Sequence, residues 1–526
     1  MNKKSLTTAV LAGLTGIAGI VSVANAVHIN PDGTGQVLIY PYYTTRNDNV
    51  TLISVVNTTD EGKAIKVRFI EGMNSREVRD FNLYMSPFDV WTATINDDIN
   101  GGARFVTRDN SCTAPYFFVN GTNPGSSAGA AGSEFTNFLF AEGSPDGGPT
   151  DLDRTREGYV EMIEMGVVTN DDKGSLDAIT HTNDDDANGN PTPADCEQLV
   201  NAWLPTVGSS GIDNYWTDDS QNDMAPPSGG IFGDGSIVNV PNGRAMGYSA
   251  TALDSFYVPG ELDPIAVHTD PGDPRPDLSN VLPATSNAVL ATGTAPPVVV
   301  SDDWMIGPQA VTAALMTNQV MNQYAVEDST NALTEWVITH PTKRFHVFDG
   351  LFGVEDAVAV PPFTRLWSGE TDTACEAVDV RIWDRNEQES GTAPGEVEPS
   401  PAPGPGQGPN IALCWEVNTV GFNDAQFIID NGYTEALGSK LFINFDVDSG
   451  THIPEEFTSG WAQVSFSQTM LNDAGTREYV GLPVTGFAVR TAAIGGDPAD
   501  PADDILFGAA YDHAYARVIQ TPAPAP

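Results

Sequence analysis

The chain has 526 residues and carries 70 acidic against 24 basic side chains, a formal net charge of −46 at pH 7. A chain of this length can bury a sizeable core and is expected to form two or more domains. So acidic a surface repels nucleic acid and anionic lipid, and neither is an expected partner.

The N-terminus has the pattern of a secretory signal peptide. Lys3 and Lys4 are followed by an apolar segment over 9–21 and by the small-x-small sequence Ala24-Asn25-Ala26. The apolar segment is too short to remain as a membrane span, so we expect cleavage and a mature chain that starts at Val27. No transmembrane helix is expected in the mature chain. The protein is therefore expected to be exported, to the cell surface, the extracellular medium or the periplasm.

The block that follows the signal predicts antiparallel strands. Within 65–69, apolar residues alternate with Lys66 and Arg68, the period of two of a strand with one packed and one solvated face. The segment 50–56 is more uniformly apolar, as expected of a central strand. Short strands separated by polar turns predict a mainly β fold, an antiparallel β-sandwich of immunoglobulin-like architecture with long loops and a few short helices.

The middle of the chain mixes strand-like segments with long loops rich in Gly, Asn, Asp, Ser and Pro. One short helix is predicted from Asp195, as its N-cap, to Trp203, and another from Pro308 to Met321. Further strands are predicted at 158–168, 236–240, 336–339, 344–348, 441–445, 461–466 and 484–490.

The predicted organisation has six parts. They are a signal peptide, an immunoglobulin-like block, a β-rich region with long acidic loops, a flexible Pro/Gly-rich excursion, C-terminal strands that complete the core, and a Pro/Ala tail. Their bounds are 1–26, 27–96, 97–391, 392–410, 411–518 and 519–526.

Four cysteines survive cleavage of the signal: Cys112, Cys196, Cys375 and Cys414. An even number in an exported chain predicts two disulfides. Sequential pairing is the simplest of the three possible connectivities. No two cysteines have the C-x-x-C spacing of a thiol-bound zinc site or a redox pair.

One segment resembles a calcium loop of the EF-hand, dockerin or thrombospondin-repeat type. It fits D-x-D-x-N-G, in which alternate side-chain oxygens converge on the ion, the glycine permits the sharp bend, and position twelve closes the shell. It departs from the EF-hand because two prolines interrupt its second half and Asp replaces the closing Glu. The candidate calcium ligands are Asp184, Asp186, Asn188, Asn190 and Asp195.

No catalytic centre can be identified from local motifs. The seven histidines form no zinc-binding motif, and no nucleophile elbow or phosphate-binding loop is present in its required context. A carboxylate pair for glycoside hydrolysis meets only in space, and Glu161 and Glu164 are two acids among too many to choose.

Several segments resemble a family of large exported proteins of Gram-negative bacteria that are described only as hypothetical or cell-surface proteins. The resemblance spans most of the mature chain but implies no known activity and no functional residue. The segments are Tyr40–Tyr43, Ser54–Thr59, Asp80–Pro87, Pro341–Phe345, Arg381–Arg385 and Gly481–Ala488.

The sequence favours a non-enzymatic surface or periplasmic protein for recognition, adhesion or scaffolding. Its expected partner is an unidentified surface partner, a glycan or a second copy of the chain. Two alternatives stay open: a secreted carbohydrate-active hydrolase with a dispersed carboxylate pair, and a surface-coat subunit stabilised by calcium. A concave groove lined with exposed Trp, with two acids roughly 5–10 Å apart, would favour the hydrolase. A flat exposed patch or a free strand edge would favour the binder or the assembling subunit.

Overall fold

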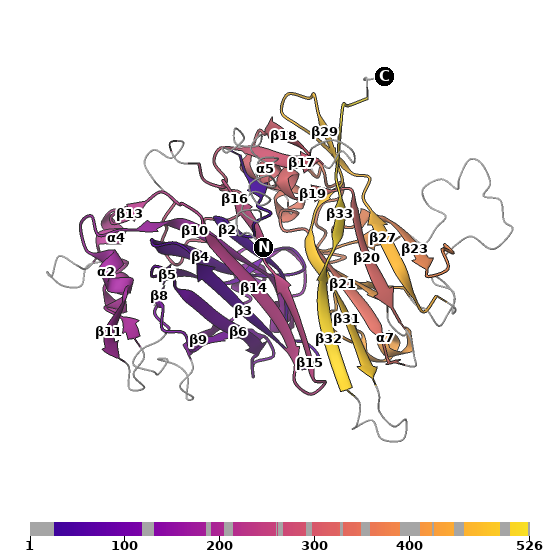
Figure 1. Ribbon diagram of the computed structural model, residues 1–526, viewed down its shortest axis with the longest axis horizontal. Helices are drawn as coiled ribbons and strands as arrows, with labels where there is room; N and C mark the ends of the chain where they lie inside the picture. Colours follow the sequence, from indigo (N-terminus) through magenta and orange to yellow (C-terminus); the bar gives the residue numbers. More distant parts are fainter. Residues whose placement is uncertain are drawn as a thin grey trace, which may run out of the picture.

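Alternating apolar and polar residues fold most of the chain into two β-sandwiches that lie side by side in the computed structural model (Figure 1). The structure describes residues 26–117, 131–185, 191–204, 214–258, 260, 267–290, 297–326, 330–348, 358–389, 411–422, 425–445, 457–494 and 505–523. The predicted mainly β, antiparallel sandwich architecture is confirmed. The immunoglobulin-like character of the N-terminal block stays a prediction.

The first sandwich packs an eight-stranded sheet against a six-stranded one. The eight-stranded sheet has the order β1 (His28–Ile29), β16 (Thr251–Asp254), β2 (Val37–Thr44), β10 (Glu157–Val168), β4 (Gly62–Glu71), β5 (Glu77–Met85), β8 (Cys112–Ala114), with β13 (Met224–Ala225) beside β10. The six-stranded sheet has the order β15 (Arg244–Ser249), β14 (Ile231–Asn239), β3 (Asn49–Asn57), β6 (Val90–Asp97), β7 (Ala103–Thr107), β9 (Ala131–Glu134).

Aromatic rings fill the space between these two sheets. Phe69 and Phe81 come from the first sheet, and Phe105 and Trp91 come from the second. The ring of Phe69 lies 5.5 Å from that of Phe105, and the ring of Phe81 lies 5.8 Å from that of Trp91. The strands predicted between 36 and 95 are therefore confirmed, with β3 in the interior of its sheet between β14 and β6.

The predicted solvated face of β4 is wrong. Lys66 and Arg68 are buried, because a second layer of chain covers the far side of the eight-stranded sheet. Lys66 Nζ donates to the backbone carbonyls of Asp270 and Asp273 at 2.9 and 3.0 Å. The strand that the alternation predicts is confirmed. Its charged face is packed rather than solvated, because charged residues can be buried where they find partners.

Strands from beyond residue 96 complete both sheets of the first sandwich. β10 lies between β2 and β4, and β14 lies beside β3. The block 27–96 therefore shares each of its sheets with strands from 157–254.

The second sandwich packs a five-stranded sheet against a four-stranded one. The five-stranded sheet has the order β26 (Phe442–Asn444), β25 (Val417–Phe422), β21 (Leu333–Thr339), β31 (Thr485–Ile494), β32 (Ile505–Asp512). The four-stranded sheet has the order β23 (Asp379–Asp384), β27 (Ser459–Ser465), β20 (Gln319–Ala325), β33 (Ala514–Ala516). Only one ladder of the described strands is parallel, that of β25 with β26.

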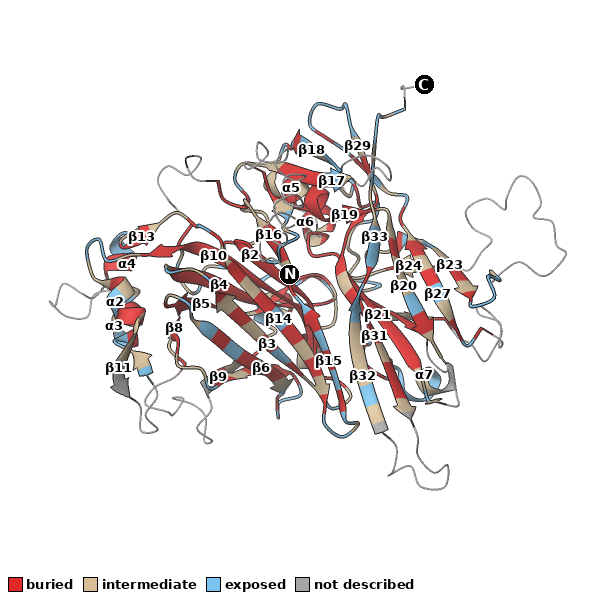
Figure 2. Ribbon diagram, in the orientation of Figure 1, coloured by how far each residue is buried: buried red, intermediate tan, exposed pale blue. Residues whose placement is uncertain are grey.

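The two sandwiches share an interface. Tyr248 of β15 stacks on Phe487 of β31 with ring centroids 4.4 Å apart, and Thr339 of β21 donates to the carbonyl of Pro41 in β2 at 2.6 Å. Figure 2 shows β10 and β4 buried along their length, whereas exposed residues gather on β32 and β33. One face of the second sandwich is therefore open to solvent.

Small sheets and short helices complete the fold. The sheets pair β11 (His181–Asp185) with β12 (Pro191–Pro193), β17 (Thr285–Leu290) with β18 (Val298–Asp303), β19 (Met316–Thr317) with β30 (Leu482–Pro483), β22 (Glu376–Ala377) with β24 (Ala412–Leu413), and β28 (Thr469–Leu471) with β29 (Glu478–Val480) and β34 (Val518–Gln520). The helices are η1 (Leu139–Gly143), η2 (Leu152–Arg156), α2 (Ser175–Ile179), α3 (Cys196–Ala202), α4 (Tyr215–Asp218), α5 (Gly307–Leu315), α6 (Arg344–Val347) and α7 (Ala425–Asn431). No described helix is long and apolar enough to cross a membrane.

The helix predictions have mixed outcomes. α3 is confirmed with Asp195 as its N-cap, since the Asp195 carboxylate accepts from the amide of Gln198 at 3.2 Å. α5 begins as predicted but ends at Leu315, and Met321 lies in β20. The strand predicted at 344–348 is wrong, because α6 occupies it. Phe345, Val347 and Phe348 are apolar and Arg344 and His346 are polar, and over five residues such a pattern does not distinguish a buried helical turn from a strand.

Both predicted disulfides are present and pair sequentially, Cys112 with Cys196 and Cys375 with Cys414. The first joins β8 to α3, and the second joins segments beside β22 and β24. Two disulfides are typical of an oxidising compartment outside the cytoplasm. The signal peptide through residue 25, the excursion from 392 to 410 and the last three residues of the tail lie outside the described residues.

Candidate functional site

The outer face of the four-stranded sheet carries two tryptophans. Alternation turns Ile382 and Ala462 into the core and leaves Trp383 and Trp461 on the solvent side. Trp461 is in register with Trp383 on one side and with Gln323 of β20 on the other. The three side chains therefore form one row across three strands.

The two indoles stack on each other. Their ring centroids are 4.1 Å apart and their planes differ by 10°. The guanidinium of Arg381 lies 4.8 Å from the Trp383 ring, and the Glu389 carboxylate holds Arg381 at 2.6 and 2.9 Å. Since Trp461 covers one face of Trp383, Arg381 covers the other. Trp461 is 39% exposed, and no described ring or cation stacks on its second face.

Arg490 and Tyr511 extend this row from the five-stranded sheet. Tyr511 is in register with Ala488, which is buried between the sheets, so Tyr511 and Arg490 both point toward the four-stranded sheet. They stay accessible because β33 pairs only with residues 319–321 of β20. The Arg490 guanidinium lies 4.0 Å from the Tyr511 ring, and its Nη1 donates to Gln323 Oε1 at 3.1 Å.

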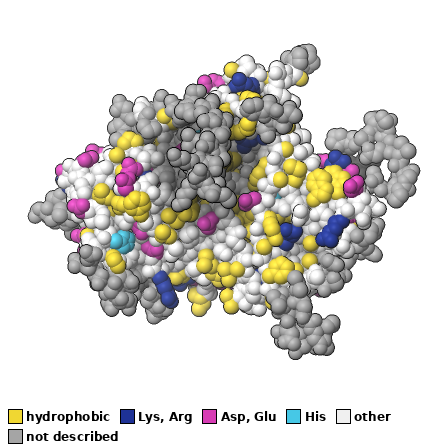
Figure 3. Space-filling model, in the orientation of Figure 1, with side chains coloured by type: hydrophobic (Ala, Val, Ile, Leu, Met, Phe, Trp, Pro, Cys, Tyr) yellow, Lys and Arg dark blue, Asp and Glu magenta, His cyan; other side chains and the backbone are white. Residues whose placement is uncertain are grey.

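We call this row the planar band, because indole, amide, guanidinium and phenol groups are all flat. Its members are Trp383, Trp461, Gln323, Arg490 and Tyr511. Figure 3 shows hydrophobic side chains beside both basic and acidic ones on the face formed by β23, β27 and β20.

Two hollows lie on either side of the planar band. Both are bordered by Gln323, Trp461 and Arg490, and their volumes are about 560 and 520 Å³. The first continues toward Ala325 at the end of β20, and the second continues toward Met321. Hollows of this size are typical of small-ligand sites.

The backbone edge of β20 beside the planar band is already satisfied. The amide of Gln323 donates to Asn322 Oδ1 at 2.8 Å, and the amide of Ala325 donates to Thr334 Oγ1 at 3.0 Å. An added strand would have to displace these side chains. The planar band therefore offers side-chain faces rather than a strand edge.

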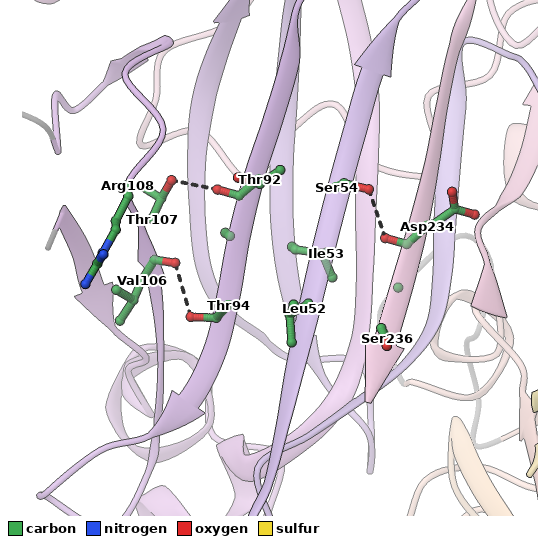
Figure 4. Close-up of a pocket in the computed structure, with 12 residues that line it drawn as sticks. Leu52, Ile53, Ser54, Thr92, Thr94, Val106, Thr107, Arg108, Asp234 and Ser236 are labelled. Atoms are coloured by element: carbon green, nitrogen blue, oxygen red, sulfur yellow. Dashed lines mark hydrogen bonds between the residues drawn. The ribbon is translucent and has the colours of Figure 1, made fainter. Parts of the chain in front are cut away.

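A third hollow, of about 570 Å³, lies on the outer face of the six-stranded sheet (Figure 4). Leu52 and Val106 contribute apolar surface, and Arg108 and Asp234 also line it. Three of its hydroxyl groups donate to the sheet's own backbone: Thr94 to Val106, Thr107 to Thr92 and Ser54 to Asp234. It contains no aromatic ring.

The paired acids Glu161 and Glu164 are buried in ion pairs. Glu161 accepts from Arg68, and Glu164 lies 3.1 Å from Lys63 Nζ and accepts the amides of Ser228 and Gly229. Burial raises the pKa of Glu161 to about 7, and it also raises the pKa of Glu164. Neither carboxylate reaches solvent, so both act as partners of buried cations.

A second buried polar cluster lies beneath α6. Burial raises the pKa of Glu416 to about 8 and lowers that of Lys343 to about 8. Both carboxylate oxygens of Glu416 lack a hydrogen-bond partner. Perturbed pKa values often mark functional sites, but both side chains are buried and no hollow described above borders them.

The candidate calcium loop is only partly described. Asp186, Asn188 and Asn190 lie outside the described residues, and Asp184 lies in β11 with its side chain not described. Asp195 caps α3. The described residues contain no group of three or more His, Cys, Asp or Glu that could hold a metal ion.

No known protein family, curated protein or solved structure matches the chain. The resemblance to exported proteins of Gram-negative bacteria therefore stays a prediction.

Sequence reasoning did not identify the planar band. It placed Trp461 in a strand without assigning its face, and Ala462 and Val464 are the residues that point inward. The period of two could have found it, because Trp461 shares its face with Gln463 and Ser465. The period of two does not predict which strands are neighbours, so it could not show that side chains from β20, β23, β27, β31 and β32 meet in one band.

Proposed function

We propose that this protein is exported and acts outside the cytoplasm, without catalysis, as a recognition or adhesion protein that binds through the planar band. The observation that carries the proposal is the uncovered face of Trp461, flanked by Gln323 and Arg490. Trp, Tyr and Arg supply most of the binding energy at interfaces. An indole on the solvent face of a strand contributes less to the core than a buried one, and its amphipathic ring is of the kind enriched at binding surfaces.

Export is supported by the N-terminal signal pattern and by the two disulfides. We expect the native protein to begin at Val27 and to contain no free thiol, which N-terminal sequencing and thiol labelling would measure. Native protein that retains residues 1–26 and four free thiols would contradict the proposal.

Recognition can be tested by retention on surfaces. Fluorescently labelled mature protein would be incubated with washed cells of the producing organism and with immobilised fractions of their envelope polymers. We expect retention that Trp461→Ala abolishes and Leu52→Ala, an equally exposed site in the third hollow, leaves unchanged. Equal retention of the wild type and Trp461→Ala would overturn the role of the planar band.

Calcium binding at 184–195 is proposed as a stabilising addition to this function. We expect millimolar calcium to raise the melting temperature of the mature protein and Asp184→Ala to remove the effect. A melting temperature that calcium does not change would remove the metal from the proposal.

A further inference from the structure

We propose that the ligand of the planar band is a neutral glycan chain that runs along β20 with one sugar ring stacked on the free face of Trp461. This inference rests on the proposed function and specifies its ligand. It goes further because it assigns a chemical class, an orientation and a contact residue.

The side chains of the planar band match the two kinds of surface on a sugar. A pyranose ring has apolar C–H faces, which gain dispersion contacts on an indole face. Its hydroxyl groups both donate and accept hydrogen bonds. Beside the free face of Trp461, Gln323 offers an amide that does both, and Arg490 offers a planar array of donors.

The arrangement of the hollows favours a chain over a single ring. The first hollow is bordered by Ala325 and the second by Met321, so they follow one another along β20 on either side of Trp461. Arg385 and Glu387 border the first, whereas Asn322 and Asp512 border the second. A linear ligand can therefore place one ring on Trp461 and its neighbours against polar groups in both hollows.

Charge favours an uncharged ligand. Arg381 is neutralised by Glu389, and Arg385 and Glu387 border the same hollow with opposite charges. Arg490 borders both hollows, and its charge is matched by Asp384 in the first and by Asp512 in the second. The whole chain carries −46, so an anionic polymer would be repelled at long range.

The surroundings of the planar band are less suited to a protein partner. The neighbouring outward residues Gln463, Ser465 and Gln319 are polar, whereas the buried centre of a protein interface is more apolar than the rest of the surface. Along the edge of β20, Asn322 and Thr334 already accept backbone amides, so a peptide strand could add there only by displacing them.

The inference can be tested by calorimetric titration of the mature protein with neutral oligosaccharides. Cellohexaose, xylohexaose and mannohexaose would be compared with oligogalacturonate as the anionic counterpart. We expect at least one neutral oligosaccharide to bind, and Trp461→Ala to weaken it by roughly tenfold or more. Trp461→Phe should restore part of the affinity, and Leu471→Ala, an exposed apolar site on β28, should have no effect.

The outcomes separate this inference from the proposed function. If none of the neutral oligosaccharides binds, and if Trp461-dependent retention on cells is lost after protease treatment but survives periodate oxidation of their carbohydrate, the ligand is a protein and the glycan inference is overturned. Tighter binding of oligogalacturonate than of every neutral oligosaccharide would also overturn it. If Trp461→Ala changes neither retention nor titration, the inference and the proposed function both fail.

Discussion

The outer faces of the two sandwiches offer hollows of nearly the same size but of different chemistry. The hollow around Leu52 measures about 570 Å³, and those beside Trp461 measure about 560 and 520 Å³. In the first, Thr94, Thr107 and Ser54 donate to the sheet backbone. Around Trp461, an indole face and planar polar groups are left to solvent. Size therefore does not identify a binding face, and the exposed indole face of Trp461 is what distinguishes the second sandwich.

The two sandwiches differ most clearly in how each one uses a tryptophan. Trp91 is fully buried in the first sandwich, and Trp461 is exposed on the second. We expect Trp91→Ala to lower the free energy of unfolding by about 3–5 kcal/mol, because it leaves a cavity. Trp461→Ala should lower it by about 1 kcal/mol or less, as surface substitutions do. Chemical denaturation measures both, and a comparable loss for Trp461→Ala would show that its indole serves the fold.

The two disulfides allow a second comparison between the sandwiches. Removing either cysteine pair, by Cys112→Ala with Cys196→Ala or by Cys375→Ala with Cys414→Ala, should destabilise the protein by about 2–4 kcal/mol. The bridges close 84 and 39 residues of chain, so loop entropy alone separates them by less than about 1 kcal/mol. Thermal unfolding of both variants tests this. A variant as stable as the wild type would show that its bridge does not constrain the unfolded chain.

Acidification should lower the free energy of unfolding through His513, which lies in the second sandwich beside the planar band. His513 is neutral there, because its Nε2 donates to the carbonyl of Val337 and its Nδ1 accepts from the side-chain amide of Asn322. Burial lowers the pKa of His513 from 6.5 to about 4. The unfolded chain therefore binds more protons between these values, and stability is lost as the pH falls from 6.5 to 4.

The measurement compares the wild type with His513→Gln, which can still donate and accept. We expect the variant to lose less unfolding free energy between pH 6.5 and 4 than the wild type does. Glu416, whose pKa burial raises to about 8, changes stability in the opposite direction over part of this range, but it is common to both proteins. Parallel pH profiles would contradict the assignment to His513.

The smallest expected effects concern single polar contacts. Gln323→Ala removes one neutral hydrogen-bonding group from the planar band and should weaken glycan binding by about two- to tenfold. Leu52→Ala should leave binding unchanged, because it lies in the other hollow. Titration of both variants with the same oligosaccharide measures the difference. A larger loss of affinity for Leu52→Ala than for Gln323→Ala would show that the glycan binds to the first sandwich.

Much of the fold could be predicted from local patterns. The alternation in 65–69, the Asp195 cap and the even number of cysteines each led to an element or a bond that the structure contains. The same reasoning failed where packing decides. Lys66 and Arg68 are covered by chain from far along the sequence, and the segment 344–348, predicted as a strand, begins with the helical turn α6.

The planar band could be predicted only in part. Alternation alone turns Trp383 and Trp461 to the outer face of their strands. It does not specify that residues 323, 383 and 461 are in register, or that Arg490 and Tyr511 reach past the edge of β20. These contacts depend on strand order and on where β33 ends, which are properties of the folded chain.

The most direct test of the central claim is a crystal structure of the mature protein with the oligosaccharide that binds most tightly. The account predicts a sugar ring against the free face of Trp461, with its neighbours in the two hollows along β20. A sugar bound in the hollow around Leu52, with the Trp461 face bare, would contradict it.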